Sequence, residues 1–404
     1  MTNELKNILE QSSKLSLDSS AEEIEEMIKL LQGLSSTADN MQMALKIFLN
    51  SAYGVMANEY FMFYNPNVAE AVTLQGQDLI KSTASMISKY YHEKWHLDKD
   101  IHKKLGIDSK TVKKIDSSVP AVAYIDTDSN FFSIQPLIDS CDYKGSSLDF
   151  MMKFDEGRLE KLFNSWHEIY ASKFHVKNLQ EFEFEKFCDS GIWTSKKHYS
   201  LDLIYKDGIK YDPLTKIDYT GIIISRGDTP PFAKEKLIIF LTYLFKNKGK
   251  VDYNNVINLV IGWKKEYDKN EVNKISYLKG ITDYEKYVIS DSAGAPLQLA
   301  SRTPIQTRAA ANYNYYLNNH PELKQKYELI KSGDKVRFYY SKPDNNFHDD
   351  VFGFINNEFP YTFAPEVDYR TMFSKSITDQ VNIFLTALGA KNIPENLIKL
   401  KRLM

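Results

Sequence analysis

The sequence predicts an α+β fold, in which helices pack on an antiparallel sheet and a mainly helical part follows. An apolar stripe from Val72 to Ile87 predicts a long helix over about 68–95, which needs a broad surface to lie on. Four segments rich in β-branched and aromatic residues predict strands that would form this surface. They are 121–125, 130–134, 182–187 and 198–205.

Two further helices are expected before the long one. A helical stretch from Glu22 to Leu31 should end at Gly33, with a break at Ser35-Ser36-Thr37, and a second helix should run from Asn40 to about Ala57. Beyond the strands, Pro230-Pro231 predicts a hinge. The pattern then becomes mainly helical, beginning with 232–247, and a basic, aromatic stretch follows at 302–317.

Composition limits the class of protein. A chain of 404 residues usually divides into two or three subdomains, and 43% hydrophobic residues are enough to build cores. The formal net charge is only -2, so any nucleic acid must be bound through local basic patches.

The two cysteines, Cys141 and Cys188, lack the flanking histidines of a zinc site and are expected to be free thiols in a reducing compartment. The N-terminus has no signal-peptide pattern, and the apolar run Leu237–Phe245 is too short to span a bilayer. We therefore expect a soluble, cytoplasmic protein with no membrane partner.

The most specific local motif is Tyr124–Ser129, an acidic turn between two apolar strands. Side chains at i and i+2 of a strand share a face, so Asp126 and Asp128 can converge. Like charges ~4 Å apart repel by about 4 kcal/mol at an effective dielectric near 20, and a magnesium ion would relieve this repulsion. A calcium loop is excluded because its required glycine and glutamate are Phe131 and Leu137. A solvated acidic turn is the simpler interpretation of this motif alone.

A second motif, Lys46–Gly54, is expected on a helix. Lys46, Asn50 and Tyr53 would share one stripe with Gln42. Lys46 could meet a triphosphate as a point charge, and Tyr53 offers a flat face and a hydroxyl to a base pair or sugar. A polar stripe on an exposed helix is the alternative.

The third motif, Thr194–Tyr199, follows the acidic and aromatic stretch Glu183–Lys186. Lys196 and Lys197 form a local basic patch that can neutralise backbone phosphates, with Tyr199 beside it. Basic dipeptides are common on protein surfaces, so this motif is weak alone.

In this order the three motifs resemble those of family B DNA polymerases, of the replicative type of T-even-like phages. The matches are K-x-x-x-N-S-x-Y-G at 46–54, Y-x-D-T-D-S at 124–129 and K-K-x-Y at 196–199. Arg226–Pro230 is similar to the family's palm-to-thumb junction, although Gly227 departs from the usual basic residue. The resemblance covers about 40–389. It implies the C-terminal part of the fingers with an N-terminal helix at 1–59, a palm at 60–232 and a thumb at 233–404.

The resemblance also implies a role for each motif residue. Asp128 would be the principal ligand of two Mg²⁺ ions, with Asp126 auxiliary and Glu185 near the metals. Lys46 and Asn50 would contact the incoming deoxynucleoside triphosphate (dNTP), with Tyr53 under the nascent base pair. Lys196, Lys197 and Tyr199 would bind primer-template DNA, the last two at the primer end. The implied reaction is attack of the primer 3′ hydroxyl on the α-phosphorus.

One expected motif is missing. The family's D-x-x-S-L-Y-P motif, whose aspartate bridges both metals, is not found, and residues 1–39 are too few for an exonuclease domain. We therefore expect the C-terminal subunit of a split polymerase, completed by an N-terminal polymerase and exonuclease subunit. The alternatives are a non-catalytic DNA-binding or structural subunit that keeps the palm fold, and a fragment of a longer protein. A sliding clamp is a further candidate partner, which the basic, apolar run Leu397–Met404 does not identify.

Overall fold

The computed structural model describes residues 19–343 and 349–394, together with residues 8, 10, 12, 13 and 347. The chain forms two compact units, Met1–Phe182 and Glu183–Met404, and each is described by itself. The predicted division into fingers, palm and thumb is finer than these two units and stays a prediction.

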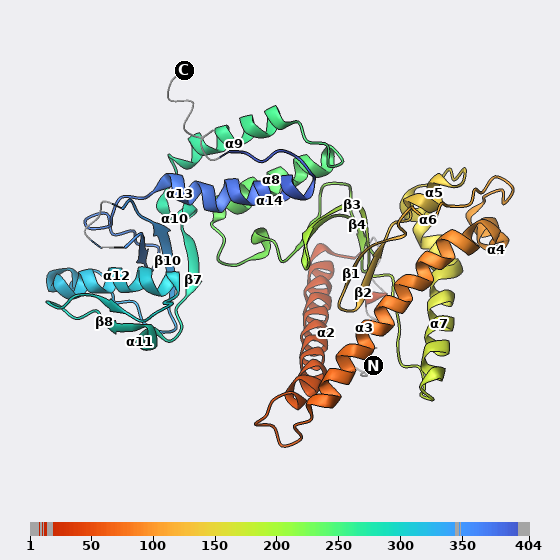
Figure 1. The fold of residues 1–404 in the computed structure, drawn as a ribbon, viewed down its shortest axis with the longest axis horizontal. Helices are drawn as coiled ribbons and strands as arrows, with labels where there is room; N and C mark the ends of the chain where they lie inside the picture. Colours follow the sequence, from red (N-terminus) through yellow and green to blue (C-terminus); the bar gives the residue numbers. More distant parts are fainter. Residues whose placement is uncertain are drawn as a thin grey trace. The chain divides into compact units, whose positions relative to one another are not determined.

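The first unit consists of helices around one β-hairpin (Figure 1). Helix α3 packs against both hairpin strands and against α7, as the long helix was expected to do. The elements are α2 Ala21–Met56, α3 Pro66–Lys89, a π-helical turn Tyr90–Lys94, a 3-10 turn Trp95–Leu97, α4 Lys99–Leu105, β1 Val122–Asp126, β2 Ser129–Phe132, α5 Gln135–Asp139, α6 Ser147–Phe154, a π-helical turn Asp155–Leu159 and α7 Glu160–Lys173.

Helix α2 is continuous, so the predicted break after Gly33 is wrong. Ser20 begins the helix with a capping box, in which its hydroxyl accepts from the Glu23 amide and its own amide donates to the Glu23 carboxylate. The Thr37 hydroxyl donates to the Gly33 carbonyl, 2.8 Å away, so this polar side chain bonds within the helix and does not end it. The two expected helices are therefore one of 36 residues.

The core of the first unit is aromatic and centred on Trp95, which is fully buried. Its indole Nε1 donates to the Ser140 hydroxyl at 2.7 Å, and the rings of Phe150 and Phe154 lie 6.0 Å from its own. These contacts join the 3-10 turn Trp95–Leu97 to the end of α5 and to α6.

Asp155, where α6 becomes a π-helical turn, is half-buried beside this core. Burial, and then the Glu160 carboxylate, raise its pKa from 3.8 to about 6. Protonation of Asp155 therefore favours the folded state. This stabilisation is complete below pH 3.8 and is lost as pH rises through 6.

We predict that Asp155→Asn raises the midpoint temperature of thermal unfolding at pH 8 and changes it little at pH 4. Thermal unfolding at both pH values measures this, with Asp39→Asn on exposed α2 as the control, and equal shifts at both pH values would contradict it.

The described residues of the second unit form three antiparallel sheets, one of them the two-stranded pair β8-β9, and the remaining helices. Its elements are β3 Lys186–Ser195, β4 His198–Lys206, β5 Ile209–Lys210, β6 Ile217–Thr220, a 3-10 turn Ile223–Ser225, α8 Pro231–Lys246, α9 Tyr253–Tyr267, α10 Val272–Ile275, β7 Tyr277–Gly280, α11 Tyr284–Tyr287, β8 Val288–Ser290, β9 Gln298–Leu299, α12 Ile305–Asn319, a 3-10 turn Pro321–Gln325, β10 Lys335–Tyr340, β11 Val351–Phe354, α13 Tyr369–Phe373, a π-helical turn Ser374–Thr378 and α14 Asp379–Ala387.

In the first sheet β4 pairs with β3, β5 and β6, and in the second the order is β11-β10-β7. Most elements after Pro230-Pro231 are helices, as predicted. The second sheet, on which α12 packs, was not expected (Figure 1). The predicted strand at 182–187 is largely wrong, because β3 begins only at Lys186. The Phe184 ring instead stacks on the Tyr205 ring, with centroids 5.4 Å apart. Its side chain therefore packs although its backbone is not part of a strand.

Cys141 and Cys188 are free, as expected. Among the described residues, no helix combines the length and the apolar character needed to cross a bilayer.

Candidate functional site

The acidic motif forms the tip of the β1–β2 hairpin, as predicted. Asp126 pairs with Ser129 across the hairpin, so Thr127 and Asp128 make the turn. Thr127 has φ +49°, a left-handed conformation that is unusual for a β-branched residue. Its hydroxyl donates to the Asp126 carboxylate at 3.0 Å, and the Ser129 hydroxyl donates to the Asp126 carbonyl at 3.1 Å. The turn therefore orients Asp126 through its neighbours and leaves Asp128 exposed.

The expected convergence of the two carboxylates does not follow from strand geometry. Asp126 is the last residue of β1, whereas Asp128 lies in the turn, where the alternation of side chains along a strand no longer applies. Among the described residues, no three His, Cys, Asp or Glu side chains form a group that could hold a metal ion. Mg²⁺ is usually held by one or two carboxylates together with substrate phosphates and water, and the hairpin fits that type of site.

The candidate nucleotide-binding residues lie together on α2. Because α2 is one helix, Lys46, Asn50 and Tyr53 occupy a common stripe, and all three are exposed. No described residue of α2 is buried, so this stripe is open to a ligand along its whole length.

The K-K-x-Y motif forms a second hairpin tip, between β3 and β4. Ser195 pairs with His198, which places Lys196 and Lys197 in the turn, and Lys197 has φ +62°. Both lysines are exposed, so they can reach a phosphate backbone. Tyr199 is only 7% exposed and packs 6.4 Å from the Trp193 ring. The Tyr199 side chain is therefore buried against the sheet, whereas the sequence suggested a position beside the lysines at the DNA.

Gly221 supports the lysine turn and was missed in the sequence. It has φ +67°, and a Cβ built on it would lie 2.1 Å from the Lys197 carbonyl oxygen. The only signal for this contact was a glycine directly after the strand-forming run 217–220.

We predict that Gly221→Ala displaces the lysine turn and destabilises the protein by about 2 kcal/mol or more, because both the backbone strain and the clash oppose the side chain. Chemical denaturation measures the loss. Gly208→Ala is the matched control, since Gly208 has φ +84° but no atom within 4 Å of the added Cβ. Equal losses in the two variants would show that the contact with Lys197 contributes nothing.

Glu185 lies just before β3 and is exposed. Its carboxylate is 3.5 Å from the Lys186 ammonium, which is also 3.2 Å from Asp218. The two acidic neighbours outweigh the effect of burial and raise the pKa of Lys186, so this lysine stays charged. Glu185 belongs to the second unit and Asp126 and Asp128 to the first, so its place near the metals stays a prediction.

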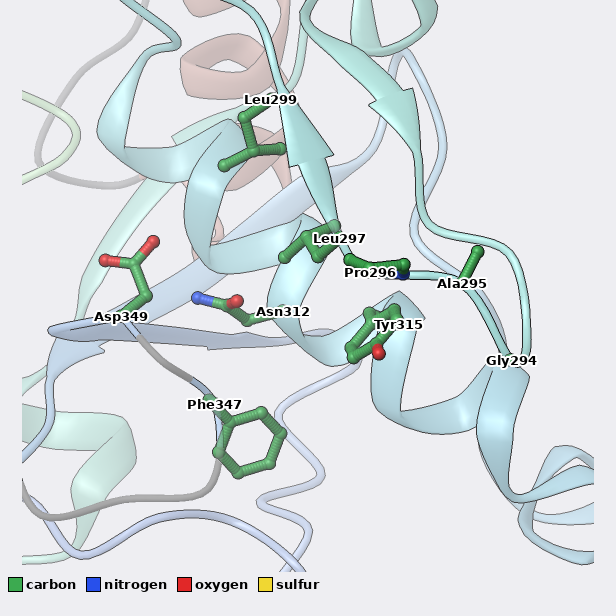
Figure 2. Close-up of a pocket in the computed structure, with 9 residues that line it drawn as sticks. All are labelled: Gly294, Ala295, Pro296, Leu297, Leu299, Asn312, Tyr315, Phe347 and Asp349. Atoms are coloured by element: carbon green, nitrogen blue, oxygen red, sulfur yellow. The ribbon is translucent and has the colours of Figure 1, made fainter.

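A separate hollow of about 700 Å³ lies in the second unit (Figure 2). Its lining comes from the β8–β9 loop, α12 and the segment before β11, and includes Pro296, Asn312 and Asp349. Asp349 is bonded to the Arg308 guanidinium, which holds its pKa below the usual range in spite of burial. None of the motif residues lines this hollow, so it is not part of the candidate site.

Comparison with known proteins identifies the family. The model of DNA polymerase family B matches residues 22–387. The DNA-directed DNA polymerase of Enterobacteria phage T4 is 23% identical over 370 residues, which are 87% of this chain and 37% of that protein. That of Escherichia phage RB69 is 23% identical over 345 residues, 82% of this chain and 34% of that protein. DNA polymerase 1 of Saccharolobus solfataricus is 27% identical over 250 residues, 61% of this chain and 19% of that protein.

The chain thus spans about a third of the length of its curated phage relatives. The family match nevertheless extends over nearly all of the chain and includes all three motifs, at 46–54, 124–129 and 196–199. The chain belongs to DNA polymerase family B.

Proposed function

We propose that this chain is the C-terminal subunit of a split DNA-directed DNA polymerase, which extends a primer with dNTPs by a two-metal mechanism. One observation carries the proposal. The D-T-D-S turn is presented at an exposed hairpin tip, while the D-x-x-S-L-Y-P motif with its metal-bridging aspartate is absent from all 404 residues. The site therefore needs a carboxylate that these 404 residues do not supply, and we propose that a second subunit supplies it.

Each motif has a task in this mechanism. Asp128 and Asp126 would hold the metals, and two bound Mg²⁺ ions would stabilise the entering and leaving oxygens of the phosphoryl transfer. Lys46 would neutralise charge on the triphosphate, and Tyr53 would support the base pair from the same face of α2. Lys197 would bind the primer backbone at the β3–β4 turn.

An exposed apolar surface on α2 supports the need for a partner. We name it the α2 apolar face, and its residues are Met41, Leu45, Phe48 and Leu49, which are 64%, 57%, 72% and 67% exposed. At 100° per residue all four lie within an arc of about 100°. Met43 and Ile47, which are 57% and 59% exposed, lie outside this arc. Several exposed apolar side chains on one arc commonly mark a protein contact. We propose that the subunit with the missing aspartate packs here.

Lys46, Asn50 and Tyr53 form a stripe beside the α2 apolar face. Counted from Met41 they lie about 120–180° around the helix, so Tyr53 is about 40° from Leu49 and Asn50 is about 100° from it. A partner on the α2 apolar face would therefore leave Lys46 and Asn50 accessible and would border on Tyr53.

Primer extension tests the proposal directly. The chain is assayed alone and with the candidate N-terminal polypeptide from the same source, and extension is expected only with both. Robust extension by the chain alone would refute the need for a partner. A single longer polypeptide in the native source, seen by mass spectrometry, would refute the split. A sliding clamp is a further proposed partner, and the run 397–404 lies outside the described residues.

A further inference from the structure

A cluster of lysines lies on the first unit, away from the three motifs. We name it the lysine surface, and its residues are Lys94, Lys99, Lys103, Lys104, Lys110, Lys113 and Lys114. All seven are exposed. The segment 94–114 has seven lysines against three aspartates, a net charge of +4 in a chain whose net charge is -2.

The fold brings these lysines together around one buried centre. The Trp95 ring lies 4.8 Å from that of His102, and the His102 Nδ1 is 3.1 Å from the Ser109 hydroxyl. Trp95 also bonds Ser140, whose carbonyl accepts from the Lys113 amide at 2.8 Å. Lys94, Lys103 and Lys110 directly adjoin Trp95, His102 and Ser109 in the chain. Lys94, Lys103, Lys110 and Lys113 therefore lie close to one buried centre.

Acidic groups do not neutralise this surface. Throughout the part of the chain that the structure describes, none of the seven lysines takes part in an ion pair. Asp98, which is partly buried within the segment, is bonded to Arg158 and to the Tyr90 hydroxyl. Burial lowers the pKa of His102, so this ring adds no charge. The lysine surface is therefore not occupied by acidic side chains of the described part of the chain, and an external partner can bind it.

Helix capping explains only part of the cluster. Lys103 and Lys104 lie in the last turn of α4, where cations interact favourably with the helix dipole. Lys110, Lys113 and Lys114 follow the helix and have no such role.

The side chains around the lysines indicate the kind of partner. Trp95 is the one aromatic residue of 94–114 apart from histidines, and it is fully buried, so no Trp, Tyr or Phe ring of this segment is available to stack on a base. Leu97 is the segment's one exposed large apolar side chain, which gives little to insert into a lipid bilayer. The surface therefore offers lysine ammonium groups and almost no side chain that could stack on a base or insert into a membrane. Such groups suit binding to the regularly spaced phosphates of a DNA duplex.

We propose that the lysine surface is a second DNA-binding site, which holds the phosphate backbone of a duplex without regard to sequence. It is separate in the sequence from the K-K-x-Y turn and does not require the proposed polymerase activity. Its effect would be to retain DNA on the protein when the primer end is not engaged.

Salt-dependent binding tests this inference. The full chain with Lys99, Lys103, Lys110 and Lys113 changed to Gln is titrated with a blunt-ended DNA duplex, without nucleotides, over a range of salt concentrations. Because each lost phosphate contact lowers the salt slope of log K by about 0.9, the slope should fall by about 3 to 4. The matched control changes four exposed lysines of the same unit, Lys144, Lys153, Lys161 and Lys177, and should leave the slope unchanged.

Several results would overturn the inference. They are an unchanged slope, an equal fall in the control, or no duplex binding by the unaltered chain. Vesicles of phosphatidylserine and phosphatidylcholine test the alternative, and loss of vesicle binding with unaltered DNA binding would replace DNA by a membrane. Circular dichroism verifies that both variants are folded. The assay contains no recessed primer end and no dNTP, so its outcome does not depend on primer extension.

Discussion

Asp128→Asn should reduce primer extension by the assembled enzyme at least about 1,000-fold, while duplex DNA binding is largely kept. The amide has nearly the shape of the carboxylate but no charge, and charge is what the hairpin tip would contribute to metal binding. Asp128 is exposed in the turn, so folding should be unaffected. Single-turnover extension with the partner subunit measures the chemical step, and a binding titration with primer-template measures the retained affinity.

The β4–β5 hairpin provides a matched control for this variant. Asp207 is also an exposed aspartate in a hairpin turn, between β4 and β5, with φ +48°. Asp207→Asn should leave extension within a few-fold of the unaltered protein. If Asp128→Asn is tolerated to the same degree, the chain is a non-catalytic DNA-binding or structural subunit that has kept the family fold.

The parts of the fold that were predictable are those in which local pattern and tertiary packing agree. The strands beside Asp126 are apolar on both sides of a polar turn, and the predicted stripe of α3 is buried at Leu79, Ile80 and Ile87, whereas Val72 is 47% exposed. The predicted break after Gly33 is wrong, because serine and threonine hydroxyls can donate hydrogen bonds to backbone carbonyls within a helix as well as end one. Strands β7 and β11 have four residues each, too few for alternation to distinguish them from loops.

The candidate site was predictable in its residues more than in its geometry. The order of the three motifs could be read directly from the sequence. The burial of Tyr199, in contrast, depends on how β4 packs. The contact of Gly221 with Lys197 depends on the pairing of β4 with β6, whose paired residues are some twenty positions apart in the chain. The place of Glu185 relative to Asp128 depends on two units of the chain, which no local pattern determines.

Phe48→Asp should weaken binding of the proposed N-terminal subunit by about 100-fold, because aromatic side chains at the centre of an interface commonly contribute 2–4 kcal/mol. Phe48 is the most exposed residue of the α2 apolar face, so the free energy of unfolding should change by less than about 0.5 kcal/mol. A large loss of affinity without a loss of stability is what distinguishes a docking residue from a core residue. Isothermal titration with the partner and thermal unfolding of the isolated chain give the two values.

The control for this variant lies on the same helix. Met43 is 57% exposed and lies five positions from Phe48, about 140° around α2. Met43→Asp introduces the same charge at a similar depth outside the α2 apolar face, so partner affinity should change by less than about three-fold. An equal loss in both variants would mean that charge on α2, and not the apolar contact, governs assembly. Unchanged affinity in Phe48→Asp would place the partner on another surface and leave the exposure of these apolar residues without a role in the polymerase.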